Sequence, residues 1–497
     1  MPSLVGSEMC IRDRPTPWHR RSSANLLLMG VIERVAATRV TRDTRTVPWV
    51  LVYLALGGIV ATLLVNIFVS GFNGPSSLFA VAIDIQVYQA GAEHLWSGLP
   101  LYDGPVFPTP TIDLLFTYPP FSAVLFLPLV ALGTTGLFLF AYIGNAILVA
   151  TLIALCMRLL GYRYSASFWV FAVTGTVALL AIEPIRTTFS LGQINVLLAL
   201  LVIADIARPR SGRFRGVGVG LAAGIKLTPL IFVVYLLVTK QWRAAGTALA
   251  TFAATVVVGF IAMPGDAWKF WTDKVIHSGR VGAIDSMSNQ SINGYVSQLL
   301  RLFDVTAYRD ASSGVFEAPG WMWMPIALVV GVLGMWAARL MRDRGKDLLA
   351  ISVVGMTGAA MSPFSWGHHW VWFVPLLLIT LDRAVRAGGR DPRLWLPPVV
   401  IVVLTFVWWF PLPDRPGFDF GLCLMPRPED PNFLQAVWFV MVCGLYPLLL
   451  LATLVAIFVG VWRTRQRAPV EEPRVARTGE TDVVDGAAVD DEQSARR

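Results

Sequence analysis

The feature that most constrains this chain is a series of long apolar runs, of about the length that crosses the hydrocarbon core of a bilayer as a helix. Backbone groups in lipid must bond to one another, so such runs predict helices. The runs are 47–70, 134–160, 166–182, 192–208, 242–263, 319–341, 347–362, 369–384, 395–410 and 434–461. Two more are ambiguous, since 119–132 is short and 216–238 is interrupted by Lys226 and Pro229. We therefore expect an all-α, polytopic membrane protein with about 10–12 transmembrane helices.

The composition excludes the other broad classes. Hydrophobic residues make up 55% of the 497 residues and charged residues only 14%, whereas soluble domains have about a quarter charged residues. The formal net charge is +8, but the arginines cluster beside apolar runs, which is typical of cytoplasmic loops rather than of nucleic-acid binding. The four cysteines show no spacing typical of a metal site or a disulfide framework.

The basic clusters predict the orientation in the membrane. Loops with Arg or Lys on the predicted cytoplasmic side are 31–46, 158–163, 208–215, 240–243, 339–346, 383–393 and 463–467. Both termini are then cytoplasmic, and the long loops 71–118, 264–318 and 411–433 lie outside. In this topology 119–132 does not fully cross and 216–238 is a broken hairpin. The protein is expected in the plasma membrane.

Three regions follow from these assignments. Residues 1–46 form a cytoplasmic N-terminal segment, 47–465 the membrane domain, and 466–497 a disordered acidic cytoplasmic tail. Residues 3–14 resemble translated adapter sequence more than a signal peptide, so 1–28 are a candidate artefact with Met29 as an alternative start.

Polar groups next to apolar spans are costly unless they face a cavity or a partner, which makes them candidate site residues. The first cluster follows the first span and contains Asp84, Gln86 and Tyr88. Residues 79–97 have helical apolar spacing, so an interfacial amphipathic helix is expected here. An acid beside an apolar surface has a raised pKa, which suits a general base. Asp84 as a helix cap or a solvated acid is the alternative.

Three further clusters lie at the ends of apolar runs. Tyr118 precedes two prolines, and it is either a sugar contact or an interfacial aromatic anchor. Another of these clusters contains Arg186, Gln193 and Asn195, which could bind phosphate or sugar hydroxyls or could cap helices. The remaining cluster contains Lys226, whose side chain either reaches a phosphate or extends toward the cytoplasmic surface.

The last two clusters are predicted to face outside. One contains Arg280, Asn289 and Gln290, a polar set that suits a saccharide, although loops are polar in any case. The other contains the adjacent His368 and His369. Neighbouring helical side chains point about 100° apart, so this pair rarely binds one metal ion. A phosphate partner or a proton carrier is expected instead.

The motifs that the sequence lacks are also informative. It contains no phosphate-binding GxxxxGK[ST] loop, no DxD acid pair, no HExxH and no GxSxG. ATP-driven transport and cytoplasmic nucleotide-sugar chemistry are therefore disfavoured. We expect neither a metal nor another cofactor.

Taken in order, the clusters resemble glycosyltransferase family 87, which has the multi-span GT-C architecture. The resemblance covers roughly residues 47–465. The segments that carry it are 84–88 (DIQVY), 98–102 (GLPLY), 118–120 (YPP), 192–195 (GQIN), 226–229 (KLTP), 288–291 (SNQS) and 362–369 (SPFSWGHH).

The resemblance implies an actinobacterial enzyme that transfers mannose from polyprenyl-phosphate-mannose to a glycolipid or lipoglycan acceptor at the outer face of the membrane. A β-linked donor and an α product imply inversion, with Asp84 as the general base. The cationic candidates for the donor phosphate are Arg186, Lys226, Arg280, His368 and His369, and Gln193 and Asn195 join the donor site. Gln86, Tyr88, Tyr118, Asn289 and Gln290 are the acceptor or sugar candidates.

The sequence leaves three alternatives open. The donor could be decaprenyl-phosphate-arabinose, used by one branch of the family. A transporter or flippase for a lipid-linked sugar would also place polar groups at mid-membrane, although it predicts an internal repeat that the sequence lacks. A structural scaffold would need neither the acid nor the histidine pair.

Overall fold

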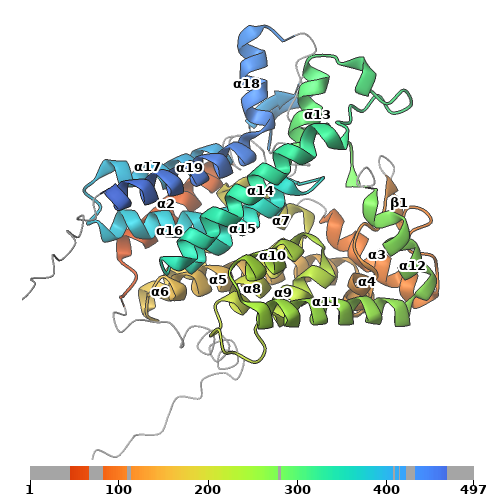
Figure 1. The fold of residues 1–497 in the computed structure, drawn as a ribbon, viewed down its shortest axis with the longest axis horizontal. Helices are drawn as coiled ribbons and strands as arrows, with labels where there is room; N and C mark the ends of the chain where they lie inside the picture. Colours follow the sequence, from red (N-terminus) through yellow and green to blue (C-terminus); the bar gives the residue numbers. More distant parts are fainter. Residues whose placement is uncertain are drawn as a thin grey trace, which may run out of the picture.

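The computed structural model describes residues 45–65, 82–108, 113–277, 281–406, 409–412, 415–420 and 431–466. Helices dominate this part of the chain, as the apolar runs predict (Figure 1). Arg280, most of the N-terminal segment 1–46 and nearly all of the tail 466–497 lie outside the described residues.

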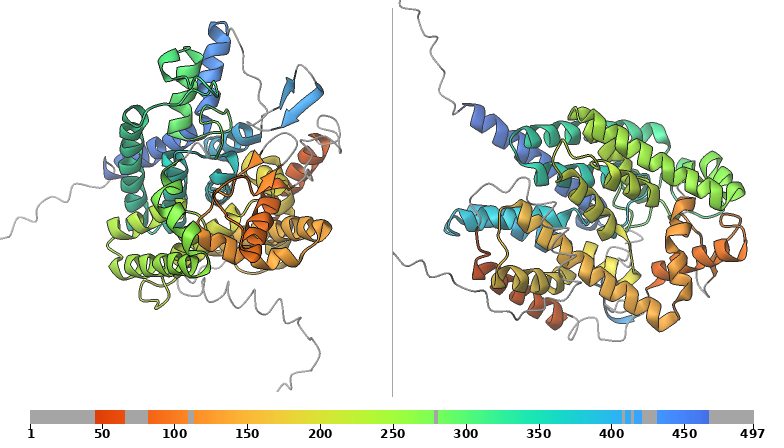
Figure 2. Two further views of the ribbon diagram at one scale, coloured as in Figure 1. Left: turned by 90° about the vertical axis from the view of Figure 1, so that its right-hand side faces the viewer. Right: turned by 90° about the horizontal axis from the view of Figure 1, so that it is seen from below.

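The helices of the first half are α2 (Trp49–Val65), α3 (Ile83–Ser97), α4 (Pro120–Phe126), η2 (Leu127–Ala131), α5 (Thr134–Leu159), α6 (Ala166–Ala178), η3 (Leu179–Ala181), α7 (Glu183–Leu191), α8 (Asn195–Ile206), α9 (Val217–Ile225), η4 (Thr228–Leu230), α10 (Ile231–Val238) and α11 (Trp242–Ala262). Those of the second half are α12 (Pro264–Thr272), η5 (Lys274–Ile276), α13 (Ile292–Leu302), η7 (Thr306–Tyr308), α14 (Gly320–Asp343), α15 (Asp347–Met361), η8 (Gly367–Trp370), α16 (Phe373–Arg386), α17 (Pro392–Phe406), α18 (Phe433–Cys443) and α19 (Leu445–Gln466). Helices α13 and α18 pack together and project from the bundle (Figures 1 and 2).

Length and composition identify the helices able to cross a membrane. Within the described residues, α5, α11, α14 and α19 meet both criteria. A fifth candidate is the broken span of α6, η3 and α7, which bends by 91°. Shorter apolar helices of 10–17 residues occupy most of the other predicted runs. The protein is thus an all-α polytopic membrane protein, while the number of 10–12 spans stays a prediction.

Both ambiguous runs are broken, as their sequences suggest. Run 119–132 forms only α4 and the 3₁₀ turn η2. Run 216–238 is interrupted at Lys226, whose backbone is extended between α9 and η4. Pro229 lies three residues further on, and it lacks the backbone N–H that would bond to the Ile225 carbonyl in a continuous helix. The break leaves a lysine at the junction of two helical segments.

The strands were not predicted, and they are short. In the long segment between α3 and α4, β1 (Phe107–Pro108) pairs antiparallel with β2 (Asp113–Leu114). Further along, β3 (Trp409–Leu412) pairs antiparallel with β4 (Arg415–Phe420). Both are local hairpin ladders, so they leave the all-α class unchanged.

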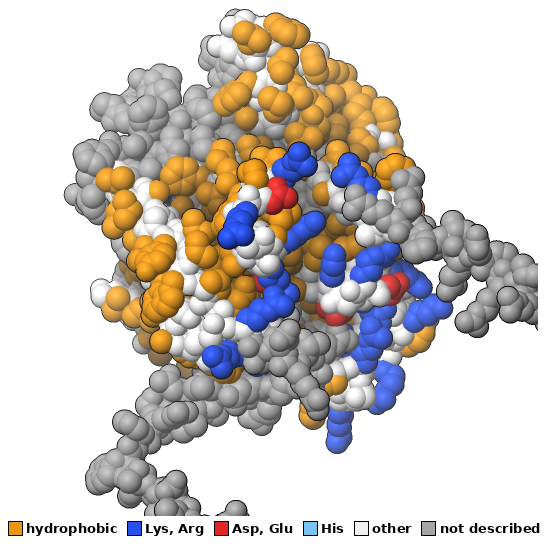
Figure 3. Space-filling view, turned by 90° about the vertical axis from the view of Figure 1, so that its left-hand side faces the viewer, with side chains coloured by type: hydrophobic (Ala, Val, Ile, Leu, Met, Phe, Trp, Pro, Cys, Tyr) orange, Lys and Arg blue, Asp and Glu red, His pale blue; other side chains and the backbone are white. Residues whose placement is uncertain are grey.

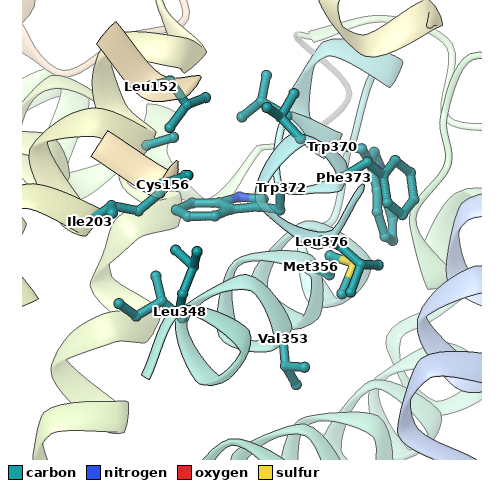
Figure 4. Close-up of a cluster of buried hydrophobic side chains, with 14 of the residues drawn as sticks. Leu152, Cys156, Ile203, Leu348, Val353, Met356, Trp370, Trp372, Phe373 and Leu376 are labelled. Carbon is teal, nitrogen blue, oxygen red and sulfur yellow. The ribbon is translucent and has the colours of Figure 1, made fainter. Parts of the chain in front are cut away.

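The core is built from large rings packed into spaces left by small residues. Trp372 lies among Leu152, Cys156 and Leu348, while Trp370 and Phe373 lie to its other side (Figure 4). Gly355 of α15 makes this possible, because a Cβ there would lie 2.0 Å from the Trp372 ring. Small residues serve the same purpose in membrane helix packing generally, since they let helices approach closely.

Basic side chains gather at one end of the bundle, the left-hand end of Figure 1 (Figure 3). Contacts there join several of the loops predicted to be cytoplasmic: Arg45 pairs through its backbone with Gly161 and Arg163, Arg386 donates to the Leu160 carbonyl, and Arg339 donates to the Val238 carbonyl. Helix α3 and the β1–β2 ladder lie toward the opposite end (Figure 1). The described parts of these predicted inner loops therefore lie on one side of the molecule.

Candidate active site

Helix α3 carries Asp84 in its first turn, where the helix dipole favours a negative charge. The helix is fixed by its apolar face, which packs against α4 and η2. Gly91 lets the Phe116 ring lie directly on α3, because a Cβ at Gly91 would be 2.3 Å from that ring. This close approach brings Tyr118, two residues later, beside Tyr88 of α3, with their hydroxyls 2.8 Å apart.

Gln193 joins this pair of tyrosines to Asp84. Its Nε2 donates to Asp84 Oδ2 at 2.5 Å. Its Oε1 accepts from the hydroxyls of Tyr88, at 3.1 Å, and Tyr118, at 3.4 Å, and from Asn195 Nδ2, at 3.0 Å. Because three donors face Oε1, the amide can turn only its NH₂ group toward the carboxylate. Gln193 therefore holds Asp84 in one orientation.

The turn between α7 and α8 places Gln193 there. Gly192 ends α7 with φ +72°, a conformation that glycine adopts at little cost. A Cβ at Gly192 would lie 3.0 Å from the Ile85 Cβ and 3.2 Å from the Ala82 Cβ. The absence of a side chain thus allows α7 to approach the start of α3.

Asp84 has the electrostatics of a base. Burial raises the pKa of its carboxyl to about 6, and the Gln193 hydrogen bond and the positive charge of Lys226 limit the rise. Helix α3 is not among the candidate membrane spans, and Asp84 is partly exposed. A carboxyl of this pKa is ionised at pH 7 and is still more basic than a solvated aspartate.

Lys226 continues the network away from the acid. Its Nζ donates to Asn195 Oδ1 at 3.3 Å and contacts His369 Nε2 at 2.8 Å. It also lies 5.3 Å from the centre of the Tyr118 ring, within the range of a cation–π contact. The helix break at Lys226 therefore places an ammonium group beside the residues that hold Asp84.

The histidine pair completes the series. His368 and His369 belong to the buried 3₁₀ turn η8, with their rings 4.9 Å apart and nearly perpendicular. An ammonium group can only donate, so His369 Nε2 accepts and the proton of the neutral ring is on Nδ1. His369 Nδ1 and His368 Nε2 are buried without a hydrogen-bond partner in the described part of the chain. Unpaired buried polar atoms of this kind are costly, which indicates a polar ligand.

Three other predicted site residues, Asn289, Gln290 and Gln86, do not join this network of hydrogen bonds. The Asn289 and Gln290 side chains are buried and bonded to backbone: Asn289 Oδ1 accepts from Ser365 N, and Gln290 Nε2 donates to the Met287 and Val442 carbonyls. They tie the segment 281–291 to neighbouring segments rather than facing Asp84. Gln86 bonds only weakly to the Ala82 carbonyl, at 3.5 Å.

Arg186 is buried one turn after Glu183 in α7, which packs against η8. Glu183 is the residue that the sequence interpretation left out, although it stands in the same cluster as Arg186. Its carboxyl accepts a hydrogen bond from Tyr446 in α19. The pairing of Glu183 with Tyr446 is a long-range contact, which the sequence alone does not reveal.

In the described residues, no group of three or more His, Cys, Asp or Glu side chains is arranged to hold a metal ion. The site instead offers one partly exposed carboxylate, a lysine and two histidines linked by amides and phenols. That arrangement can remove a proton at one end and stabilise an anion at the other.

Comparison with known proteins identifies the family. The sequence model of glycosyltransferase family 87 matches residues 116–363. A polyprenol-phosphate-mannose-dependent alpha-(1-2)-phosphatidylinositol mannoside mannosyltransferase of Mycobacterium tuberculosis is 32% identical over 381 residues, which cover 73% of this chain and 81% of the relative. The chain belongs to glycosyltransferase family 87. It is therefore a glycosyltransferase, and the transporter and scaffold alternatives are wrong.

Two more relatives have similar names. The enzyme of the same name from Mycolicibacterium smegmatis is 32% identical over 66% of this chain and 76% of its own length. A polyprenol-phosphate-mannose-dependent alpha-(1-2)-phosphatidylinositol pentamannoside mannosyltransferase of Mycobacterium tuberculosis is 35% identical over 66% of this chain and 72% of its own length. No solved structure matches. Asp84 lies before the stretch that the family model matches, so its role rests on the geometry.

Proposed function

We propose that this family 87 enzyme transfers a mannosyl residue from a polyprenyl-phosphate-mannose donor to a phosphatidylinositol-mannoside-type lipid at the outer face of the plasma membrane. The donor and acceptor are those in the names of the relatives, which favours mannose over arabinose as the sugar. The outer face is favoured because α3, the helix that carries Asp84, lies away from the basic end of the bundle (Figures 1 and 3).

The observation that carries the proposal is the unbroken series of contacts from Asp84 through Gln193 and Asn195 to Lys226 and His369. Inverting transfer needs two groups in fixed positions, one to accept a proton and one to stabilise the leaving phosphate. This series supplies both and fixes their separation.

The reaction is a single displacement. The acceptor hydroxyl gives its proton to Asp84 as its oxygen forms a bond to C1 of the donor sugar. On the opposite face the bond between C1 and the phosphate oxygen breaks, and polyprenyl phosphate leaves with the electron pair. A β-linked sugar becomes α-linked, and Asp84 later returns the proton to water.

The leaving phosphate is assigned to Lys226 and the histidine pair. Lys226 supplies a full positive charge, and His369 supplies the Nδ1 proton that has no partner in the described residues. Charge-assisted hydrogen bonds of this kind stabilise a developing anion without a metal ion. Arg186 and Arg280 are not needed for this scheme.

Asp84→Asn tests the assignment. Asparagine keeps the shape and the hydrogen bond to Gln193 but cannot accept the proton, and positioned proton removal contributes about 10²–10⁴ in rate. We expect at least about a hundredfold loss of turnover, with donor binding retained, in purified protein given radiolabelled polyprenyl-phosphate-mannose and phosphatidylinositol mannoside.

Glu93→Gln is the matched control, because Glu93 is an exposed acid on the same helix. It should retain turnover. Near-normal turnover of well-folded Asp84→Asn protein would exclude Asp84 as the base, and a loss in Glu93→Gln alone would move the assignment to Glu93.

A further inference from the structure

Glu183 is a buried carboxyl that the proposed reaction does not use. It opens α7 and is 3% exposed. A carboxyl group in an apolar interior is strongly destabilising if it is left unpaired. A leucine or methionine would fill the same space without that cost, so the presence of an acid calls for a role that an apolar side chain does not fill.

The carboxyl lies against the turn that carries the histidines. A Cβ built on Gly367 would fall 2.0 Å from Glu183 Oε1 and 2.1 Å from Oε2. Gly367 is the first residue of η8, and His368 and His369 follow directly. The space that a side chain at position 367 would occupy is therefore filled by the Glu183 carboxyl.

Tyr446 holds the carboxyl from the other side. Its hydroxyl donates to Glu183 Oε2. Its ring packs against Trp370, with centroids 5.5 Å apart, and Trp370 is the last residue of η8. Glu183 and Tyr446 thus contact η8 at its first and last residues and join it to α7 and α19.

We propose that Glu183 is a positioning residue that sets the histidine turn for the donor phosphate. Its carboxyl oxygens fix Gly367 and, through Tyr446, Trp370. The His369 ring therefore stays beside Lys226, with the His368 ring next to it. The role depends on shape and on one accepted hydrogen bond rather than on a proton transfer. This inference rests on the proposed function of the histidine pair.

The first test is the Michaelis constant for the donor. Glu183→Leu, which keeps the bulk and removes the acceptor, should raise the donor KM at least about tenfold, while the acceptor KM and the acidic limb of the pH profile stay in place. Glu183→Gln still accepts from Tyr446 and should restore the donor KM. If Glu183→Leu does not fold, Tyr446→Phe, which removes one hydroxyl, gives the same readout.

The second test uses the contact itself. Gly367→Ala forces a methyl group into the carboxyl and should raise the donor KM alone. In the double variant with Glu183→Ala, that methyl group has room, so the donor KM should recover partly and the two effects should not add. Additive effects, or loss of thermal stability with an unchanged donor KM, would mean that Glu183 is only a packing residue.

His369→Ala separates this inference from the function on which it rests. If His369→Ala leaves the donor KM unchanged, the phosphate role of the histidines is wrong. If His369→Ala raises the donor KM and neither Glu183→Leu nor Tyr446→Phe does, the positioning role of Glu183 alone is wrong.

Discussion

The hydrogen bond from Gln193 to Asp84 should set the pH at which the enzyme becomes active. We consider Gln193→Met, which keeps the length of the side chain and removes the amide. The Asp84 carboxylate then loses the donor that now lies 2.5 Å away, while Lys226 remains. Because that hydrogen bond stabilises the charged form, its removal raises the Asp84 pKa above its present value of about 6.

The size of the change follows from the kind of bond. A hydrogen bond to a charged group contributes about 1.5–3 kcal/mol, and one pKa unit corresponds to about 1.4 kcal/mol. The Asp84 pKa should therefore move to about 7–8. At pH 7 the ionised fraction would fall from roughly nine-tenths to between about a half and a tenth. Activity should fall at neutral pH and recover in alkaline buffer.

The assay is kcat/KM for transfer against pH, which reports the base of the free enzyme. The wild type should lose activity as the pH falls through about 6, since Asp84 must be ionised to accept a proton. In Gln193→Met this limb should lie at least about one unit higher. Gln86→Met is the control, because Gln86 bonds to its own helix, and its limb should not move. An unshifted limb in Gln193→Met refutes the role given to this hydrogen bond.

Three further predictions test other parts of the structure. Gly192→Ala should lower the stability of the protein by about 1–3 kcal/mol and should also reduce turnover, because position 192 has φ +72° and faces Ile85. Thermal unfolding in detergent measures the stability, and a wild-type value would contradict the close approach of α7 and α3. Transfer should survive EDTA, and activity lost to EDTA and restored by Mn²⁺ would show that Lys226 and the histidines do not suffice for the phosphate. A cysteine that replaces the exposed Ser312 should react with an impermeant thiol reagent added outside intact cells, whereas a cysteine that replaces the exposed Ser211 should not react. The opposite labelling pattern would invert the proposed topology.

The sequence predicts the fold class well because the signal is strong and local. An apolar run in a membrane protein has few structures available to it. The break at Lys226 follows from Pro229, which lacks the N–H that a continuous helix would need there. The number of spans is harder to predict. Several runs form helices of 10–17 residues, and α6 and α7 meet at 91°, so the length of an apolar run does not say where a helix bends.

The sequence also predicts most members of the site, but not how they are connected. Asp84, Gln193, Lys226 and His369 each stand out as polar residues beside apolar runs, and the structure joins them. Asn289 and Gln290 stand out in the same way, yet their amides bond to backbone. An amide that satisfies a buried carbonyl and an amide that orients the proposed general base look alike until their partners are known.

Glycine positions, which the polarity of the sequence does not reveal, determine which polar residues meet at the candidate site. Gly192 lets α7 approach Asp84, Gly91 brings the Tyr118 segment onto α3, and Gly367 makes room for the Glu183 carboxyl. Each glycine is defined by what lies where its side chain would be, which is a contact between distant segments. The polar residues therefore supply the chemistry, while these glycines determine which of them meet. Substituting a glycine should accordingly disturb the site while leaving each polar residue in place, which the Gly192 and Gly367 variants test directly.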